Sequence, residues 1–241
     1  MATADMSSSL RKRWDESNAT LASIPPESRR EDWSADRERA MAARRADTLD
    51  SWLRLPDSSG MPESLETARL NLAPVHPSDA ERIQAIFPQW EVVRYLASAV
   101  PWPYPADGAQ AFCREAFAAG ERGEGWTWTI RLRTEPDQII GVIELMTDPD
   151  NNRGFWLAPP WHGLGLATEA CHTVTDYWFD VLNFPLLRAW KAVANEASRR
   201  ISQRQGMRLV SVADRDYVSG RLPAELWEIT AEEWHAHRAR E

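Results

Sequence analysis

PPWHGLGLATEA, residues 159–170, joins a short apolar run, residues 154–157, to a segment with helical periodicity, residues 168–182. We expect the run to be a strand and the segment to be a helix. Gly163 and Gly165 lie in the turn between them, where glycine lets the backbone bend tightly and approach a ligand. The first N–H groups of a helix lack intrahelical partners, and the helix dipole favours negative charge there. The turn is therefore expected to bind a phosphate through its backbone amides.

Two common phosphate loops do not fit this turn. It lacks the Lys-Ser/Thr ending of a Walker A loop, and it has two glycines where the dinucleotide fingerprint has three. It resembles instead the pyrophosphate loop of the GNAT superfamily of acetyl-CoA-dependent N-acetyltransferases, which reads Gln/Arg-x-x-Gly-x-Gly/Ala. Residues 162–167 match that pattern, with His162 in place of the usual Gln or Arg. The flanking Pro-Pro-Trp and Ala-Thr-Glu-Ala look like the RimJ/RimL branch, the ribosomal-protein N-terminal acetyltransferases and their small-molecule relatives.

The composition of the 241 residues fits a globular protein with one domain of about 170 residues and an appendage. A net charge of −8 argues against a nucleic-acid partner and suits a cationic amine. Two cysteines, Cys113 and Cys171, form neither a disulfide framework nor a metal cluster, so no metal is expected. We expect no membrane partner and a cytoplasmic location, because the sequence has no apolar run of about 18 residues and no apolar signal at its N-terminus.

Residues 1–62 differ from the rest of the chain, since they are rich in charged and small residues and poor in β-branched ones. We expect helices at about residues 10–21 and 36–53, followed by a linker that ends at Pro62. Three interpretations stay open. This helical extension packs on its own domain or on a second subunit of a homodimer, it lines the substrate site, or it is disordered.

The remaining chain alternates strands and helices, which is typical of an α/β fold. The expected strands are residues 66–75, 126–133, 138–146, 154–157, 187–194, 207–212 and 226–230. The expected helices are residues 80–87, 91–97, 107–120, 168–182, 195–205 and 231–240, with Ser78 or Asp79 as the first cap and residues 214–224 as the connection between the last two strands.

This order of elements coincides with the GNAT fold over about residues 66–230. The resemblance implies a mixed central sheet of about seven strands, flanked by helices and splayed between strands 4 and 5 to admit the cofactor. We therefore expect the acetyltransferase domain to occupy residues 63–241.

The resemblance also implies acetyl-CoA as the cosubstrate and a set of residues that bind it. Leu157 sits where backbone groups bind pantetheine, and the N–H of Phe155 sits where an oxyanion donor meets the acetyl carbonyl. Asn195, in Asn-x-x-Ser, is expected to contact the cofactor, and it also suits a helix cap. The expected cofactor-binding residues are Phe155, Leu157, His162, Gly163, Leu164, Gly165, Leu166, Ala167, Thr168 and Asn195.

Three residues are candidates for the chemistry. Ser198 stands where many GNAT enzymes carry a tyrosine acid and where the RimL-type enzymes have serine, and it would act on the leaving thiolate. Asp216 matches the carboxylate before Tyr-x-x-Gly that is proposed as the base in the RimL-type pattern. Glu144, in the strand after the hairpin, is the alternative base, and each carboxylate could act directly or through a water.

Aromatic residues near the expected cleft are candidates for the acceptor pocket, since aromatic faces attract cations and line apolar sites. Trp126 and Trp128 share a face at a spacing of two residues. The same tryptophans would also suit a hydrophobic core. The candidates are Trp102, Tyr104, Trp126, Trp128 and Tyr217, with Trp90, Trp156 and Trp161 nearby.

These patterns lead to one principal hypothesis. The chain is expected to transfer the acetyl group of acetyl-CoA to a primary amine by direct attack in a ternary complex. The acceptor is either a small molecule or a protein N-terminus. The alternative is a non-catalytic acyl-CoA-binding or regulatory module on the same fold, which would keep the glycine turn and lose the acid and the base.

Overall fold

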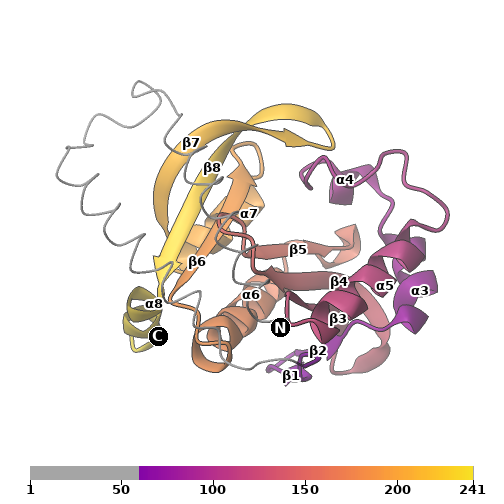
Figure 1. The fold of residues 1–241 in the computed structure, drawn as a ribbon, viewed down its shortest axis with the longest axis horizontal. Coiled ribbons are helices and arrows are strands. Elements are labelled where there is room, and N and C mark those ends of the chain that lie inside the picture. Colours follow the sequence, from indigo (N-terminus) through magenta and orange to yellow (C-terminus); the bar gives the residue numbers. More distant parts are fainter. Residues whose placement is uncertain (1–59, 241) are drawn as a thin grey trace, which may run out of the picture.

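The computed structural model describes residues 60–240, which form eight strands in two sheets (Figure 1). The first sheet has the order β1-β2-β3-β4-β5 and the second the order β6-β8-β7, and all paired strands within them run antiparallel. The strands are β1 Leu65–Glu66, β2 Leu70–Pro74, β3 Gly125–Leu132, β4 Glu135–Met146, β5 Arg153–Leu157, β6 Leu186–Ala192, β7 Arg208–Tyr217 and β8 Gly220–Thr230.

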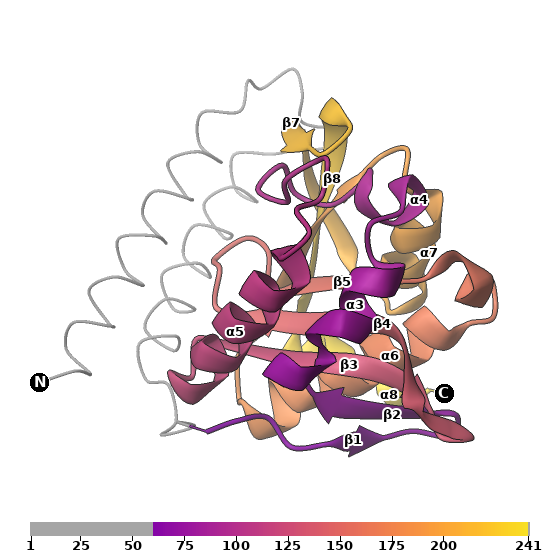
Figure 2. The same ribbon diagram turned by 90° about the vertical axis from the view of Figure 1, so that its right-hand side faces the viewer.

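Helices cover both faces of the first sheet. Figure 2 shows α3 and α5 in front of this sheet and α6 behind it. The helical segments are η2 Pro77–Asp79, α3 Ala80–Ile86, α4 Trp90–Val93, α5 Gly108–Glu121, η3 Pro159–Trp161, α6 Leu166–Asp176, the π-turn η4 Tyr177–Val181, α7 Glu196–Arg204 and α8 Ala231–Arg238.

The alternation of side chains in β4 divides the core into two parts. Ile143 and Leu145 pack in the larger cluster with α6 and η4, whereas Val142 packs in a second cluster with Ile83 and Phe87 of the α3 side. Because successive residues of a strand point to opposite faces, a strand covered on both faces reads as a continuous apolar run.

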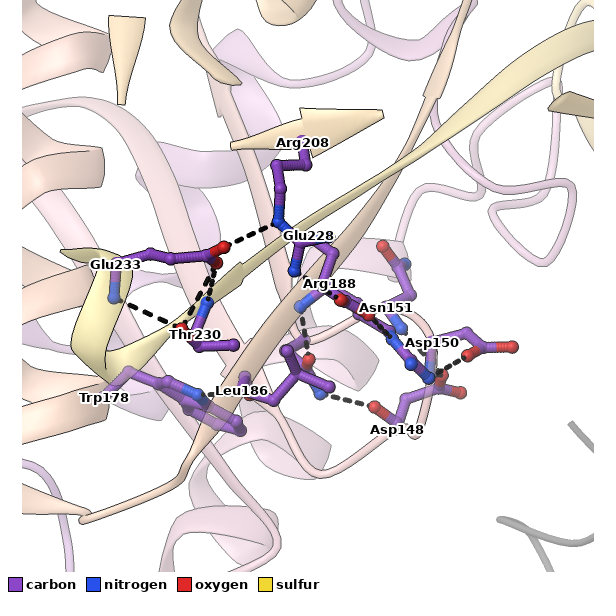
Figure 3. Close-up of polar contacts among 11 residues, drawn as sticks. Asp148, Asp150, Asn151, Trp178, Leu186, Arg188, Arg208, Glu228, Thr230 and Glu233 are labelled. Carbon is purple, nitrogen blue, oxygen red and sulfur yellow. Dashed lines mark hydrogen bonds and ion pairs between the residues drawn. The ribbon is translucent and has the colours of Figure 1, made fainter. Parts of the chain in front are cut away.

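The two sheets are joined at one point and diverge from there. The Asn152 N–H donates to the Arg188 carbonyl at 2.7 Å, and the Arg188 N–H donates to Asn152 Oδ1 at 2.7 Å. The buried Arg188 guanidinium bonds Asp150 at 3.0 Å and Glu228 at 2.8 Å (Figure 3). Beyond this junction β5 and β6 form no ladder, so the sheets open as a wedge.

The expected fold is confirmed. When the two-residue β1 is set aside, seven strands remain and the break between β5 and β6 falls between the fourth and the fifth. The expected helix 168–182 is α6 followed by η4. Asp79, one of the two expected caps, is the N-cap residue of α3, but its side chain makes no capping bond to that helix. It accepts instead from the His76 N–H, and His76 caps the preceding η2 by accepting from the Ser78 N–H at Nδ1.

The prediction that residues 214–224 form a connection between the last two strands is wrong. Residues 214–224 belong to the long hairpin of β7 and β8, which turns at Val218 and Ser219. Asp216 therefore lies in a strand and not in a loop. The charged residues that suggested a loop are exposed on this hairpin, where the ladder satisfies the backbone without burial of their side chains.

The helices expected in residues 1–59 lie outside the described residues, so the boundary of the extension at about residue 62 stays a prediction. Within residues 60–240, none of the helices combines the length and the hydropathy needed to cross a bilayer.

The junction of the sheets should carry a large share of the stability. Replacing Arg188 with Met would leave buried Asp150 without this cation and weaken the pairing of Glu228, so we expect a loss of about 3–5 kcal/mol in the free energy of unfolding. Arg208→Met is the matched control. Arg208 also pairs with Glu228, at 3.0 Å, but is 41% exposed, so the expected loss is about 1 kcal/mol or less. Urea unfolding of both variants measures the difference, and equal losses would contradict the role of the buried junction.

Candidate active site

A cavity of about 1040 Å³ occupies the wedge between the two sheets. β4 and β5 line one side of it, and β6, α7 and β7 line the other. The glycine turn before α6 and the segment from α4 to Tyr104 complete its wall. Among residues 60–240, no group of three or more His, Cys, Asp or Glu side chains is arranged to hold a metal ion.

The glycine turn has the backbone conformation that the sequence predicts. Gly163 has φ +76° and Gly165 has φ +78°, and Gly165 is the N-cap residue of α6. A Cβ at Gly163 would meet nothing within 4 Å, so the turn is open toward the cavity. Both the N-terminus of α6 and the space above the turn are therefore available to an anion.

Two side chains hold the turn in place. The His162 ring bonds the Leu157 carbonyl through Nε2 at 2.7 Å, which ties the turn to the end of β5. Arg69 donates to the Leu164 carbonyl at 2.9 Å and pairs with Glu169 at 2.7 Å. The bonds from Thr67 and Arg69 outweigh the partial burial of Glu169 and lower the pKa of its carboxyl. His162 thus positions the loop through the backbone.

The edge of β5 that faces the wedge offers backbone groups to a ligand. Met146 N–H bonds the Asn152 carbonyl, and Ala158 N–H bonds the Ile140 carbonyl. Backbone bonding alternates along an antiparallel ladder. The backbone N–H and C=O groups of Gly154 and Trp156 therefore point to β4, while those of Phe155 and Leu157 point into the wedge. The Leu157 carbonyl is used by His162, which leaves both groups of Phe155 and the N–H of Leu157 for a ligand.

Along the edge of β6 that faces the wedge, the first backbone groups are hydrogen-bonded and the last ones are free. Trp178 Nε1 bonds the Leu186 carbonyl, Asn152 bonds Arg188, and Asn151 Oδ1 accepts from the Trp190 N–H at 3.2 Å. Beyond these bonds, the Trp190 carbonyl and the Ala192 N–H face the wedge, because the alternate residues of β6 pair with β8. The wedge therefore opens into the cavity after the first few residues of β6.

Asn195 follows β6 and caps α7. Its Oδ1 accepts from the Ser198 N–H at 3.2 Å, which places Ser198 on the first turn of α7. Both residues line the cavity.

Glu144 lies on the face of the first sheet opposite to α6. It pairs with Gly154 of β5, and a Cβ at Gly154 would come within 2.6 Å of Glu144 Oε1. The absence of a side chain at Gly154 therefore makes room for this carboxyl. Burial raises the pKa of Glu144, and within residues 60–240 no group forms a hydrogen bond or ion pair with its carboxyl.

An apolar lobe of the cavity lies on the same face as Glu144. Phe87 is in contact with Tyr104 and Trp156, with ring centroids 4.7 and 5.0 Å apart. Ile83 and Phe112 complete this lobe, and all of these residues line the cavity. The lobe suits an apolar group on a substrate.

The tip of the β7–β8 hairpin closes this side of the cavity. Ser98 N–H bonds the Asp216 carbonyl at 3.2 Å, Val218 N–H bonds the Leu96 carbonyl at 3.0 Å, and Ser219 N–H bonds the Arg94 carbonyl at 3.2 Å. The β7–β8 hairpin is thus tied to the segment that follows α4. Tyr217 is buried beside this bridge, whereas the Asp216 side chain is exposed.

Most of the predicted site residues come together in this cavity. They are Glu144, Phe155, Leu157, His162, Gly163, Gly165, Leu166, Ala167, Thr168, Asn195, Ser198, Asp216, Tyr104 and Tyr217. Leu164 does not line the cavity, and its side chain is exposed. Trp102 is also exposed and packs against Trp90, with ring centroids 5.7 Å apart.

The assignment of Trp126 and Trp128 to the acceptor pocket is wrong. They share a face, as expected, but that face is the buried one: Trp126 contacts Trp178, and Trp128 contacts Tyr177. Both are core residues on the α6 side. Trp156 and Trp161, which were named as neighbours only, do line the cavity.

Sequence reasoning missed Arg153, Trp190 and Lys191, which also line the cavity. A signal was present for two of them, because Arg153 and Lys191 are cations inside strands that are rich in apolar residues. Such residues are rarely buried without a partner or a function.

Comparisons with known proteins agree with this geometry. The acetyltransferase (GNAT) domain family matches residues 69–208. The N-acetyltransferase YoaA of Bacillus subtilis (strain 168) is 29% identical over 146 residues, which are 59% of this chain and 81% of YoaA.

Two solved structures have the same fold. The ribosomal-protein-S5-alanine acetyltransferase of Vibrio fischeri is similar with a TM-score of 0.62 and 15% identity, over 72% of this chain and 99% of that one. RimJ of Mycobacterium smegmatis, in complex with CoA-disulfide, is similar with a TM-score of 0.61 and 19% identity, over 77% of this chain and 92% of RimJ.

These neighbours support the RimJ/RimL-like resemblance at the level of the fold. The family match spans more than half of the chain and includes the glycine turn, β5 and α7. The chain therefore belongs to the GNAT family of acetyltransferases, and it is an acyltransferase.

Proposed function

We propose that this protein transfers the acetyl group of acetyl-CoA to a primary amine by direct attack in a ternary complex within the wedge. The observation that carries the proposal is the two-sided cavity. Backbone donors and a helix N-terminus lie along the α6 side of β5, and an unpaired carboxyl with an apolar lobe lies on its other side. Two substrates can therefore reach β5 from opposite faces.

The cofactor side fits acetyl-CoA. The open glycine turn suits the pyrophosphate, and the free edges of β5 and β6 suit the amides of the pantetheine arm, which would lie between them like an added strand. The Phe155 N–H would then donate to the acetyl carbonyl. Loss of one such donor in other enzymes slows the reaction by roughly 10²–10³.

Glu144 is the better candidate for the base. It pairs in register with Gly154, the residue before Phe155. Its carboxyl has no partner among the described residues, and burial raises its pKa. A base with a pKa near the working pH is the most effective. Asp216 lines the cavity too, but its side chain is exposed on β7.

The acceptor that suits the site best is a small primary amine with an apolar group. The amine would face Glu144, the apolar group would fill the lobe at Phe87 and Trp156, and the hairpin bridge would limit the size of the molecule. A peptide N-terminus is the second candidate, since one solved structure of the same fold is named as a ribosomal-protein-S5-alanine acetyltransferase.

An acceptor screen tests the activity itself. Full-length protein with acetyl-CoA should release free thiol in the presence of a hydrophobic or aromatic primary amine, and less with amino acids, aminoglycosides or N-terminal peptides. Release of thiol only with peptides would favour the second acceptor. Binding of acetyl-CoA with no turnover on any amine would support the non-catalytic module instead.

The glycine turn can be tested through affinity for acetyl-CoA. Gly165→Glu adds a side chain and a negative charge where the pyrophosphate is expected, so binding should weaken at least tenfold, which is about 1.4 kcal/mol. Gly165→Gln is the matched control, because it has the same size and the same strain at φ +78° without the charge. Calorimetry on folded variants should show the larger loss for Glu, and unchanged affinity in both would remove the turn from the site.

The base can be identified from the pH dependence of turnover. Because burial raises the pKa of Glu144, the acid limb of the wild-type profile should lie above the range of an ordinary carboxyl, with activity falling as the pH falls through it. Glu144→Gln should lower turnover by about 10²-fold and remove that limb, with partial recovery at higher pH where more amine is neutral. Asp216→Asn is the comparison. If it alone produces the pH-dependent loss, Asp216 is the base.

A further inference from the structure

Lys191 is a buried lysine that lines the wedge. It lies on β6, is 5% exposed, and lines the cavity. Its Nζ lies 5.4 Å from the centre of the Phe155 ring, on the α6 side of β5. Lysine is almost never fully buried unless it is paired.

The described part of the chain supplies no counter-ion for Lys191. Within residues 60–240, its ammonium group forms no hydrogen bond or ion pair. Glu225 lies directly across the β6–β8 ladder, but Arg199 binds both of its carboxyl oxygens, at 2.7 and 2.9 Å. The Trp227 Nε1–H also donates to Glu225, at 3.1 Å.

None of the other charged or titratable groups described around Lys191 is a carboxylate that pairs with its ammonium group. Arg153 approaches from β5 and Cys171 from α6. Within the described part of the chain, the Arg153 guanidinium bonds only neutral groups, Gln205 Oε1 at 2.7 Å and Thr175 Oγ1 among them, and its Nε has no partner. Burial, with a smaller effect from Arg153, lowers the pKa of Lys191 to about 7.

Lys191 and Arg153 are two buried cations that line the cavity, and neither is paired with a carboxylate among residues 60–240. Because an unpaired buried charge is costly, they point to an anion that arrives with a ligand. The pyrophosphate is assigned to the glycine turn. Lys191 lies instead beside Phe155, whose backbone N–H is the donor proposed for the acetyl carbonyl. The negative charge that develops at that end of the cofactor, apart from the carbonyl oxygen, is on the leaving sulfur.

We infer that Lys191 is the counter-ion and proton donor for the CoA thiolate that leaves in the acetyl transfer, an inference that rests on the proposed function. The bond from the amine nitrogen to the acetyl carbon forms, and the bond from that carbon to sulfur breaks with its electron pair on sulfur. The amine proton goes to the base on the Glu144 side. The Lys191 ammonium gives a proton to the thiolate, and the resulting amine is reprotonated from solvent.

This role differs from that of Ser198. The Ser198 hydroxyl is neutral and can donate one hydrogen bond to the sulfur, whereas an ammonium both neutralises the thiolate and can protonate it. The difference is measurable without an acceptor, because bound CoA itself carries the thiol.

The test is the titration of the CoA thiol bound to full-length protein. Thiolate is followed by its ultraviolet absorbance between about pH 6 and about pH 10, with bound desulfo-CoA, which lacks the thiol, as the blank. In the wild type the bound thiol should ionise at least one pH unit below its value in Lys191→Met, a tenfold shift in the acid dissociation constant. Lys191→Arg should retain most of the shift, and Ser198→Ala should move it by less.

Two outcomes of the CoA experiments overturn the inference. The first is binding of CoA by the wild type and by Lys191→Met with the same thiol titration. The second is an equal loss of affinity for CoA and desulfo-CoA in Lys191→Met without a shift of the thiol, which would make Lys191 a holder of the pantetheine arm. Failure of the wild type to bind CoA at all overturns the proposed function, and is recognised separately by calorimetry.

The variant should fold, because methionine removes an unpaired buried cation. Its melting temperature should equal or exceed that of the wild type near neutral pH. The folded-state pKa of Lys191 is below the unfolded one, so the wild type gains stability as the pH rises above about 7, and the advantage of Lys191→Met should shrink toward alkaline pH. A purely structural Lys191 would instead make Lys191→Met less stable at every pH, which would overturn the inference.

Discussion

The pairing of Asn152 with Arg188 is the constraint on which the site depends. It uses the backbone of both residues and one side-chain amide, so it fixes the register in which β5 and β6 meet. The Arg188 side chain is held between Asp150 and Glu228, and the whole junction is buried. Because the sheets are fixed here and separate immediately afterwards, the backbone groups further along both strands have no partners in the opposite sheet. Unpaired backbone N–H and C=O groups on both edges of the opening need hydrogen-bond partners, and a ligand with amide groups can supply them.

β5 connects the two faces of this slot. Phe155 and Leu157 present their backbone to the wedge and their side chains to the α6 side, while Gly154 and Trp156 face β4 and the α3 side. Gly154 leaves room for the Glu144 carboxyl on that second face, since a side chain there would displace it. A strand of five residues thus positions the proposed oxyanion donor, the space for the proposed base and one wall of the apolar lobe. Few substitutions in it would leave the site unchanged.

The sequence predicted the features that depend on local patterns. The glycine turn, the strand before it and the Asn195 cap follow from spacing and composition, and the structure has all three. The long β7–β8 hairpin was missed because its residues around Asp214 are charged and exposed, so they carry no apolar alternation. For Trp126 and Trp128, periodicity showed that they share a face, but it could not show which face α6 covers. Lys191 was missed because a buried charge in an apolar strand is informative only when the surrounding acids are known to be engaged elsewhere.

The charges of the site have opposite signs on opposite sides of β5. Glu144, on the acceptor side, has a raised pKa, and Lys191, on the cofactor side, has a lowered one, and burial is the main cause of both shifts. Environments that bring an acid and a base toward neutrality in this way are typical of paired acid–base roles. In the proposed reaction the amine loses a proton on one side of β5 and the sulfur gains one on the other. Neither group has a protein counter-ion among residues 60–240. In the proposed reaction the substrates would supply both counter-ions: the ammonium of the acceptor for Glu144, and the thiolate created by the transfer for Lys191.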